Sequence, residues 1–513
     1  MINSDNQTSS KRIAKNTMML YIRMFIMLFI GLYASRVIIN VLGIQDYGLY
    51  EVIGGIVAMF GFVNSSMATA TSRFLTYELG KKDFDINKLR KVFHVSLTIH
   101  IFIAFLILIL GETIGLWFVC NKIQMAPGKL IAGIFVYQSV LFSLIITIIN
   151  VPYNASIISH ERMDAYAYIG IIDATLKVLI LFLLPILPFD KLISYSIAYL
   201  LIQCVLQCLY IVYCRRKFDE TSFRLDFDKE IMKGILPFLG WNLAKEFGGV
   251  CSNQGLNVLL NLFYGPSVNA ARGIMFQVQQ AVAKCCINFQ VALNPQIIKS
   301  YASDDLSYMQ KLVYTSSKFA FFLLFILALP IWFEIESILT WWIKTVPDYT
   351  AIFIRIMLFE AIFSVMSNPL TVSVMATGRI KNFQIVMTIT SLLILPISYI
   401  FLSFGGKAEV VFVINVVFSF ISYIIKIYFV YSILHFSLRN YVSQVLLRIL
   451  WPFMLCVLFT SLVYIYFQTL PYRTIVVFVT SFSVSLIAIY CFGITSPERD
   501  FVNRLIKKYA WQL

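Results

Sequence analysis

Long apolar stretches dominate this sequence and limit what it can fold into. A helix that crosses the roughly 30 Å hydrocarbon core of a bilayer needs about 20 apolar residues, and about fourteen such stretches fit into the 513 residues. Lipid offers the backbone no hydrogen-bond partners, so such stretches must be helical. Only 13% of the residues are charged, whereas soluble domains have roughly 25%. The sequence therefore predicts an all-α integral membrane protein of about 14 transmembrane helices, with short loops and no folded extramembrane domain. The expected spans are residues 13–42, 48–75, 92–119, 130–157, 165–187, 191–213, 233–263, 267–294, 312–340, 350–377, 382–404, 408–434, 442–468 and 472–494.

Basic residues predict the orientation of these spans. With the N-terminus placed inside, the inner segments contain 26 Lys and Arg residues and the outer segments contain 7. Short loops rich in Lys and Arg stay in the cytoplasm, so both termini are expected there. The first apolar stretch is too long for a cleavable signal and is expected to remain as the first helix. The net charge of +15 then follows from topology and from attraction to membrane lipids, and nucleic acid is not an expected partner.

An internal repeat organises the chain. The segment Asn150–Arg162 resembles Asn368–Arg379, and one constant shift in residue number matches Pro152 with Pro369, Ser156 with Ser373 and Arg162 with Arg379. A second pair joins Asn40–Gly48 to Asn261–Asn269, and nearly the same shift relates Gly43 to Gly265. Both pairs lie at equivalent junctions between spans, which indicates a duplicated unit of six helices.

Two lobes in parallel repeat follow from this unit, because a copy with an even number of spans begins on the same side as its predecessor. The expected parts are a disordered cytoplasmic N-terminus (1–12), an N-lobe of six spans (13–214), a basic cytoplasmic inter-lobe loop (215–232), a C-lobe of six spans (233–434), two further spans (435–494) and a cytoplasmic amphipathic tail (495–513). Transporters of this kind hold their substrate between the lobes and alternate access by rocking them.

Cations inside the spans are the first functional candidates, because charge within a bilayer is costly. Arg23, Lys245 and Lys284 lie deepest, on the first, seventh and eighth spans. Arg36 and Arg272 lie nearer the outer ends, where their side chains could equally reach the headgroups. Arginine binds phosphate oxygens bidentately, so these cations predict a cavity for an anionic substrate.

Acidic residues are fewer in the spans: Glu112, Asp173, Glu246, Glu334, Glu336 and Glu360. Asp173 and Lys177 are four residues apart on one helix face, so they either neutralise each other or couple transport to an ion. Glu246 follows Lys245, but adjacent residues of a helix do not face each other. Lys245 is therefore expected to need another partner or a watery cavity.

The motifs resemble those of the polysaccharide transporter family, the Wzx-type O-antigen and capsule flippases. The resemblance rests on the Asn16-Thr17 helix entry, the Leu42–Gly48 turn, Arg162, Gly378-Arg379, Asn294-Pro295 and the count of spans. It implies a two-lobed multidrug/oligosaccharidyl-lipid/polysaccharide exporter fold in a bacterial inner membrane. It also implies an undecaprenyl-pyrophosphate-linked glycan as cargo and a polysaccharide polymerase as a possible partner. Six residues are expected in turns that repeat between the lobes and accompany gating: Gly43, Asp46, Gly48, Gly265, Arg162 and Arg379.

Three alternatives stay open from the sequence. A multidrug and toxin extrusion type cation antiporter shares the duplicated plan but should line its cavity with carboxylates, and a flippase for the peptidoglycan lipid precursor also fits. A membrane glycosyltransferase or polymerase should have a long outer loop, and the one D-x-D string, Asp226 to Asp228, lies in the basic loop as a solvated linker. No Walker motif or nucleophile elbow appears, and the nine Cys and four His lack metal-ligand spacing. The sequence predicts neither an enzyme nor a cofactor.

Overall fold

The computed structural model describes most of the chain as helices. The described residues are 16–27, 30, 37–38, 41–42, 46, 49–50, 53–54, 57, 60–122, 128–186, 188–343, 346–468, 470, 472–500 and 503. Within these ranges no residue lies in a β-strand, and ten helices are long and apolar enough to cross a membrane. The all-helical, multi-pass architecture that the sequence predicted is confirmed.

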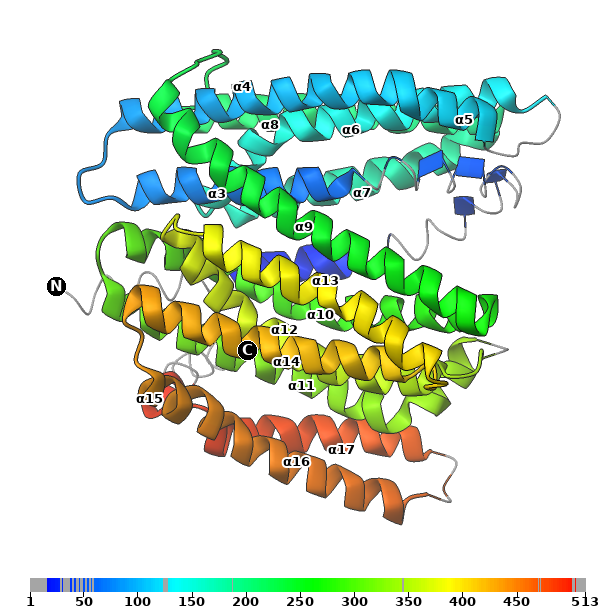
Figure 1. Ribbon diagram of the computed structural model, residues 1–513, viewed down its shortest axis with the longest axis vertical. Coiled ribbons are helices and arrows are strands. Elements are labelled where there is room, and N and C mark those ends of the chain that lie inside the picture. The colour runs from blue at the N-terminus through cyan, green and yellow to red at the C-terminus, as the bar shows by residue number, and fades with distance from the viewer. Residues whose placement is uncertain are drawn as a thin grey trace, which may run out of the picture. The chain divides into compact units, whose positions relative to one another are not determined.

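The helices of the first copy follow one another with short connections (Figure 1). They are α3 (Gly61–Gly80), α4 (Ile86–Leu110), the π-helical turn η1 (Gly111–Gly115), α5 (Leu116–Lys122), α6 (Leu130–Ser159), α7 (Met163–Leu183), η2 (Leu184–Ile186) and α8 (Lys191–Lys217). The second copy comprises α9 (Lys229–Tyr264), α10 (Pro266–Ala302), α11 (Leu306–Trp342), α12 (Thr350–Ala376), α13 (Lys381–Ser403) and α14 (Val410–Leu434). The remaining elements are α15 (Leu438–Tyr441), η3 (Val442–Leu446), α16 (Leu447–Tyr466), α17 (Arg473–Ala488) and η4 (Ile489–Gly493).

These helices form two compact units. The N-terminal unit comprises Met1–Phe247, Ile298–Asp305 and Ile380–Gln384, and the C-terminal unit comprises Gly248–Ile297, Leu306–Arg379 and Ile385–Leu513.

In the N-terminal unit, α6 packs against α3, α4 and α8 (Figure 1). Its core contains Phe93 of α4 and Tyr153 of α6, whose rings meet edge to face at 5.3 Å between centroids. Cys214 of α8 is fully buried and donates its thiol to the Tyr153 carbonyl. This cysteine is a packing residue.

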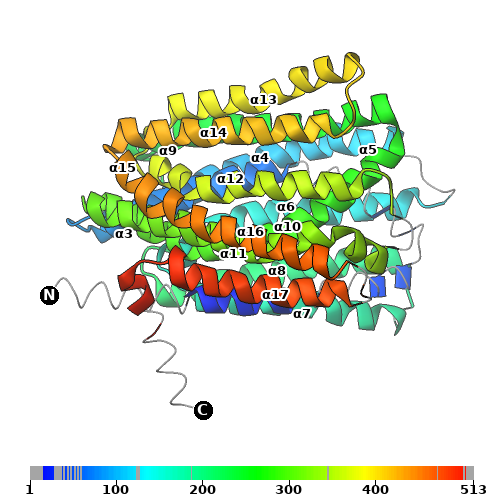
Figure 2. The ribbon, with the colours of Figure 1, turned by 90° about the horizontal axis from the view of Figure 1, so that it is seen from below.

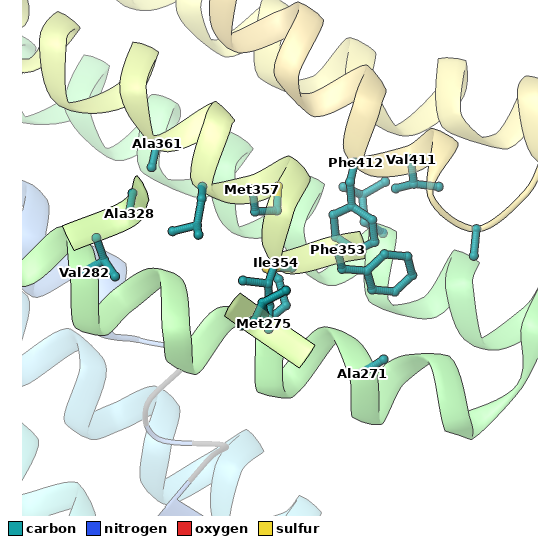
Figure 3. Packing of buried hydrophobic residues seen from close by; sticks show 14 of the residues in the cluster. Ala271, Met275, Val282, Ala328, Phe353, Ile354, Met357, Ala361, Val411 and Phe412 are labelled. Carbon is teal, nitrogen blue, oxygen red and sulfur yellow. The ribbon is translucent and has the colours of Figure 1, made fainter. Parts of the chain in front are cut away.

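In the C-terminal unit, α12 packs against both α11 and α14. Figure 3 shows the buried cluster that joins α10, α12 and the start of α14, with Met275, Phe353, Met357 and Phe412 at its centre. The centroids of the Phe353 and Phe412 rings lie 4.2 Å apart. Lipid tails are as apolar as these side chains, so close packing and dispersion hold such helices together.

The repeat is visible in the backbone. Helices α6 and α12 each contain an internal proline, Pro152 and Pro369, at matched positions of the two copies. Each helix is followed by a residue in the left-handed region, Glu161 at φ 58° and Gly378 at φ 74°, which the same shift in residue number relates. The two copies therefore turn in the same way between their fourth and fifth spans.

The last two spans, α16 and α17, pack against each other and against α11 (Figure 2). Two ion pairs with buried members on α11 connect α17 and the residues after it to α11, and we call these the clamps. In the first half of α11, the Lys318 ammonium lies 2.6 Å from Glu498, which follows α17 and η4. In the second half of α11, Glu334 accepts hydrogen bonds from Arg473 at 2.8 and 3.1 Å.

Glu498 lies in the tail that was expected to be amphipathic. A helix begins there at Ser496, so Thr495 takes the N-cap position. Glu498 accepts the Thr495 N–H at 2.7 Å, as in a capping box. Its carboxylate therefore has a helix-capping role in addition to its ion pair.

Candidate functional site

Arg23 belongs to a group of polar side chains in the N-terminal unit. Its guanidinium carbon is 4.1 Å from the ring centroid of Tyr166 on α7. A Cβ atom at Gly170, one turn further along α7, would collide with the Arg23 guanidinium, so glycine permits this close approach. The Arg23 Nε atom is buried and has no hydrogen-bond partner among the described residues. Among the described residues this cation is held by stacking, and a guanidinium with donor capacity left over is suited to bind an oxyanion.

The same cluster extends along α7 to α8. Lys177 lies 2.9 Å from a carboxylate oxygen of Asp173, and its ammonium is 5.1 Å from the Tyr199 ring centroid. Tyr210 lies within electrostatic range of both Arg23 and Asp173. We call Arg23, Tyr166, Asp173, Lys177, Tyr199 and Tyr210 the arginine–tyrosine cluster. It combines cations with hydroxyl groups that both donate and accept hydrogen bonds.

The pairing expected between Asp173 and Lys177 is confirmed by their contact. Each neutralises the other at four-residue spacing on one helix. An ion-coupling role for the pair stays a prediction.

Lys245 was expected not to meet Glu246, and that expectation is wrong. The Lys245 ammonium lies 2.7 Å from a Glu246 carboxylate oxygen. Both side chains are about one third exposed, at 39% and 34%, and long flexible side chains at the helix surface can bend around to meet even when their Cβ atoms diverge. The pair still belongs to the same repeat position as Arg23, because the shift that relates Gly43 to Gly265 also relates Arg23 to Lys245.

Arg272 connects two helices within the C-terminal unit and does not extend to the headgroups. It is 8% exposed, donates to Asn257 Oδ1 at 3.1 Å and to the Asn253 carbonyl at 2.8 Å, and also contacts Asn253 Oδ1. Its guanidinium lies over the Phe276 ring. These contacts occupy it between α9 and α10, which favours a structural role over substrate binding.

Lys284 on α10 is exposed and has no hydrogen bond or ion pair with another described residue. Its role as a cavity cation stays a prediction. Arg36, Gly43 and Gly48 lie outside the described residues.

The remaining turn residues have separate local partners. Asp46 binds Lys129 at 2.8 Å, and Arg162 binds Asp164 through two nitrogens at 3.1 and 3.2 Å. Gly265 has φ +79° between α9 and α10, a conformation that glycine adopts without strain. Arg379 is exposed, and its backbone N–H donates to the Thr377 hydroxyl at 3.2 Å. These contacts explain how the turns form, and gating at them stays a prediction.

A second polar group, inside the C-terminal unit, was not selected from the sequence. Glu360 of α12 accepts hydrogen bonds from Gln279 of α10 at 3.0 Å and from Ser419 of α14 at 2.6 Å. Lys426 of α14 lies within electrostatic range and donates to Ser367 at 2.8 Å. Glu360 could have been selected from the sequence, because it is an ionisable residue within a span. Its partners could not, because the sequence does not show that α10, α12 and α14 lie side by side.

The D-x-D string has a structural role. Asp228 accepts the backbone N–H groups of Glu230 and Ile231 at 3.1 and 3.3 Å, at the start of α9. Lys91 binds its other oxygen at 3.1 Å. The Lys91 ammonium and these backbone donors lower the pKa of Asp228. An aspartate that caps a helix needs no catalytic explanation.

The inter-lobe loop packs on the N-terminal unit and is not simply solvated. Glu220 is 2% exposed and accepts a hydrogen bond from His160 at 2.7 Å, while the Thr98 hydroxyl accepts the Asp226 N–H at 3.1 Å. Such contacts hold the loop against α4 and the end of α6.

Comparison of the sequence with protein-family models and with curated proteins gives no match. Solved structures do match. A MOP superfamily transporter from Pyrococcus furiosus aligns with a TM-score of 0.70 and 13% identity, over 83% of this chain and 96% of its own. A MATE transporter in the bent conformation aligns with a TM-score of 0.72 and 14% identity over the same shares. The chain has the fold of a MATE transporter of the MOP superfamily.

A multidrug resistance MATE family transporter in its outward-facing conformation agrees, with a TM-score of 0.71 at 13% identity, over 83% of this chain and 96% of its own. The all-helical fold predicted from the sequence is thus confirmed by solved structures, and those structures are themselves transporters. At such low identity the match establishes the fold and leaves the cargo to be argued from the residues.

Proposed function

We propose that this protein is a flippase that carries an undecaprenyl-pyrophosphate-linked oligosaccharide from the cytoplasmic to the outer leaflet of a bacterial inner membrane. The observation that carries the proposal is Arg23, a membrane-embedded guanidinium stacked on Tyr166 with a buried Nε atom that no described residue engages. A pyrophosphate supplies oxygens for such donors. The neighbouring tyrosines supply hydroxyls for the hydrated sugar.

The repeat supports the same cargo. Lys245 takes the position of Arg23 in the second copy, so each first helix of the duplication has one cation at an equivalent place. The Lys245 ammonium is paired with Glu246 at 2.7 Å, whereas no described carboxylate pairs with Arg23, so Arg23 is the member of the matched pair that we assign to the anion.

The fold is compatible with a change of substrate charge within the superfamily. One matched structure, the transporter from Pyrococcus furiosus, is described as having a binding pocket of reverse polarity that suggests a different function. We propose a corresponding difference for this chain. Its 26 to 7 distribution of basic residues supports cytoplasmic termini. We propose that transport runs outward, toward a polymerase that would consume the product.

A cation antiporter is the second candidate, and Glu360 is the observation that favours it. A carboxylate within a span, contacted by Gln279 and Ser419 with Lys426 nearby, is a site where a proton or a cation could exchange. The two candidates therefore assign the transported species to different units.

The test is translocation of a fluorescent undecaprenyl-pyrophosphate oligosaccharide in proteoliposomes, measured by access of an external glycosidase. We expect Arg23→Ala to lower the rate by about 10- to 100-fold, because a charge-assisted hydrogen bond is lost, and Arg23→Lys to restore part of it. Arg439→Ala, which removes an exposed cation of α15, is the matched control and should be unchanged.

The same vesicles distinguish the alternatives. Export of a cationic dye that depends on Glu360 and not on Arg23, with no movement of lipid-linked glycan, would establish the antiporter. Faster transport of the peptidoglycan lipid precursor than of the oligosaccharide lipid would reassign the cargo while retaining the flippase.

A further inference from the structure

An apolar cavity of about 620 Å³ lies in the C-terminal unit between α11, α12, α14 and α16. Aromatic and aliphatic side chains form its walls, among them Phe325, Ile362, Val416 and Val457. Arg355 is the one charged side chain among the described residues that line it. The volume is in the range of ligand sites in proteins, and neither proposed transport site uses it.

The cavity is as deep as one leaflet of a bilayer. Its lining residues on α12 extend from Ile352 to Ile362, which is about 15 Å along a helix and about half of a 30 Å hydrocarbon core. In the orientation proposed above, α12 starts on the outer side, so the cavity occupies the outer leaflet. The volume holds roughly 20 groups of the size of a water molecule, about 30 Å³ each. That suits one acyl chain and is too small for an undecaprenyl chain.

The outer end of the cavity has both signs of charge. The Arg355 guanidinium donates to the Trp332 carbonyl at 3.1 Å and lies 3.1 Å from a carboxylate oxygen of Glu336. The Glu336 side chain is 68% exposed. A guanidinium has five donors, so these contacts leave donors for a phosphate, and the Glu336 carboxylate has a second oxygen for an ammonium. Trp332 is typical of the membrane interface, where headgroups lie.

The helices around the cavity are held in place on the α11 side. Glu334–Arg473 and Lys318–Glu498 fix α17 and the residues after it to α11, and α16 packs on both α11 and α17. An unfilled apolar cavity of this size within a membrane would forfeit dispersion contacts along its walls.

We propose that the cavity binds a phosphatidylethanolamine molecule of the outer leaflet. One acyl chain fills the space between α11, α12, α14 and α16, the phosphate binds Arg355 and the ammonium binds Glu336. A zwitterionic headgroup with N–H donors matches this pair of side chains. Phosphatidylglycerol has no ammonium for Glu336, and the choline of phosphatidylcholine has no N–H to donate.

The experiment uses the full chain, purified in mild detergent and delipidated, with native mass spectrometry to measure binding of each of the three lipids. We expect phosphatidylethanolamine to bind about tenfold more tightly than the other two, as one charge-assisted contact predicts. Arg355→Gln should weaken its binding about tenfold, and Glu336→Gln should abolish the preference for it. The control pair Lys407→Gln and Glu409→Gln, which removes another outer ion pair, should change neither.

Filling the cavity tests the acyl chain. Val416→Trp introduces a ring into the space and should prevent binding, whereas Val417→Trp, on the same helix at a position that is 49% exposed, should not. If Val416→Trp fails to fold, as judged by gel filtration, Val457→Phe tests the same space from α16. Equal binding of the three lipids by the native protein would overturn the proposal. Displacement of phosphatidylethanolamine by undecaprenyl pyrophosphate, sensitive to Val416→Trp, would also overturn it and would assign the cavity to the cargo.

Discussion

The third helix of the first copy, α4, and its counterpart in the second copy, α11, begin at matched positions, Ile86 and Leu306. Ser96 and Ser316, which the same shift in residue number relates, are both buried. Both helices are interrupted at matching places, α4 by the π-turn at Gly111–Gly115 and α11 by non-helical dihedral angles at Glu334 after Pro330. The backbones of the two copies therefore follow one plan.

The side chains at two of these matched positions differ in charge. Thr98 and Ile114 of the first copy correspond to Lys318 and Glu334 of the second. Lys318 and Glu334 are 2% and 1% exposed and form the clamps with the chain around α17. The two further spans attach to the second copy, whose third helix provides buried charges that Arg473, Thr474 and Glu498 engage.

The largest expected effect on the free energy of unfolding comes from the Glu334–Arg473 clamp. Glu334→Ala should lower the free energy of unfolding by about 3 kcal/mol, because it leaves Arg473 and Thr474 without their shared acceptor. Ile114→Ala, at the matching position of the first copy, should change it by less than about 0.5 kcal/mol, because Ile114 is 65% exposed. Thermal unfolding in detergent measures both. Equal losses would show that the two third helices do not differ as described.

Breaking the Lys318–Glu498 clamp should lower the free energy of unfolding by less, and a second substitution should reverse the loss. Glu498→Gln leaves the buried Lys318 ammonium without a counter-charge and should cost about 2 kcal/mol. The double variant Lys318→Met with Glu498→Gln should return to within about 1 kcal/mol of the native protein, since apolar replacement of a buried pair is nearly neutral. A double-mutant cycle isolates the interaction energy. If the losses of the single variants Lys318→Met and Glu498→Gln simply add in the double variant, the two side chains do not stabilise each other.

The matched turns after α6 and α12 should give a smaller change in the free energy of unfolding. Gly378→Ala should destabilise the protein by about 1 kcal/mol, because an L-residue is strained at φ 74°. Glu161 accepts that strain at φ 58° and binds Lys299 at 2.6 Å with its carboxylate 1% exposed. Glu161→Gly should therefore also destabilise, by about 1 kcal/mol, although glycine suits the backbone better.

Chemical denaturation of these two variants is the measurement. A Glu161→Gly protein more stable than the native one would mean that the ion pair with Lys299 contributes nothing and that the turn is set by backbone preference alone.

The smallest expected effect concerns the starts of the last helix of each copy. Asp190 caps α8 by accepting the Leu192 and Ile193 N–H groups at 2.9 and 3.2 Å, whereas Glu409 at the start of α14 makes no such side-chain cap. Asp190→Ala should cost about 1 kcal/mol near neutral pH, and Glu409→Ala less than about 0.5 kcal/mol.

The first of these losses should depend on pH. Burial opposes ionisation of Asp190, but its backbone donors and the Lys129 ammonium together lower its pKa. A carboxylate with a lowered folded-state pKa stabilises the fold above its unfolded pKa, near 3.8, and loses that contribution as pH falls through the folded pKa. Unfolding midpoints of native and Asp190→Ala protein should therefore converge below that value. A constant difference down to about pH 3 would mean that the Asp190 charge is not involved.

The all-helical multi-pass architecture, the duplication and the matched turns could be predicted from the amino-acid sequence. These depend on features that repeat along the chain: apolar stretches of bilayer length, and Pro152, Arg162 and their matches in the second copy. It also identified Arg23 and the contact of Asp173 with Lys177, because charge inside a span is conspicuous and four-residue spacing is local.

Which cations of the spans are bound by side chains of other helices is known only from the tertiary structure. Arg272 is bound by Asn253 and Asn257, residues 19 and 15 positions away on another helix, and the sequence does not show which helix faces it. The same holds for Glu360 between three helices and for Glu334 with Arg473, which are 139 positions apart. Periodicity gives the length and face of a helix, whereas the partner of a buried charge depends on how non-adjacent helices pack, and that is settled only when the chain is folded.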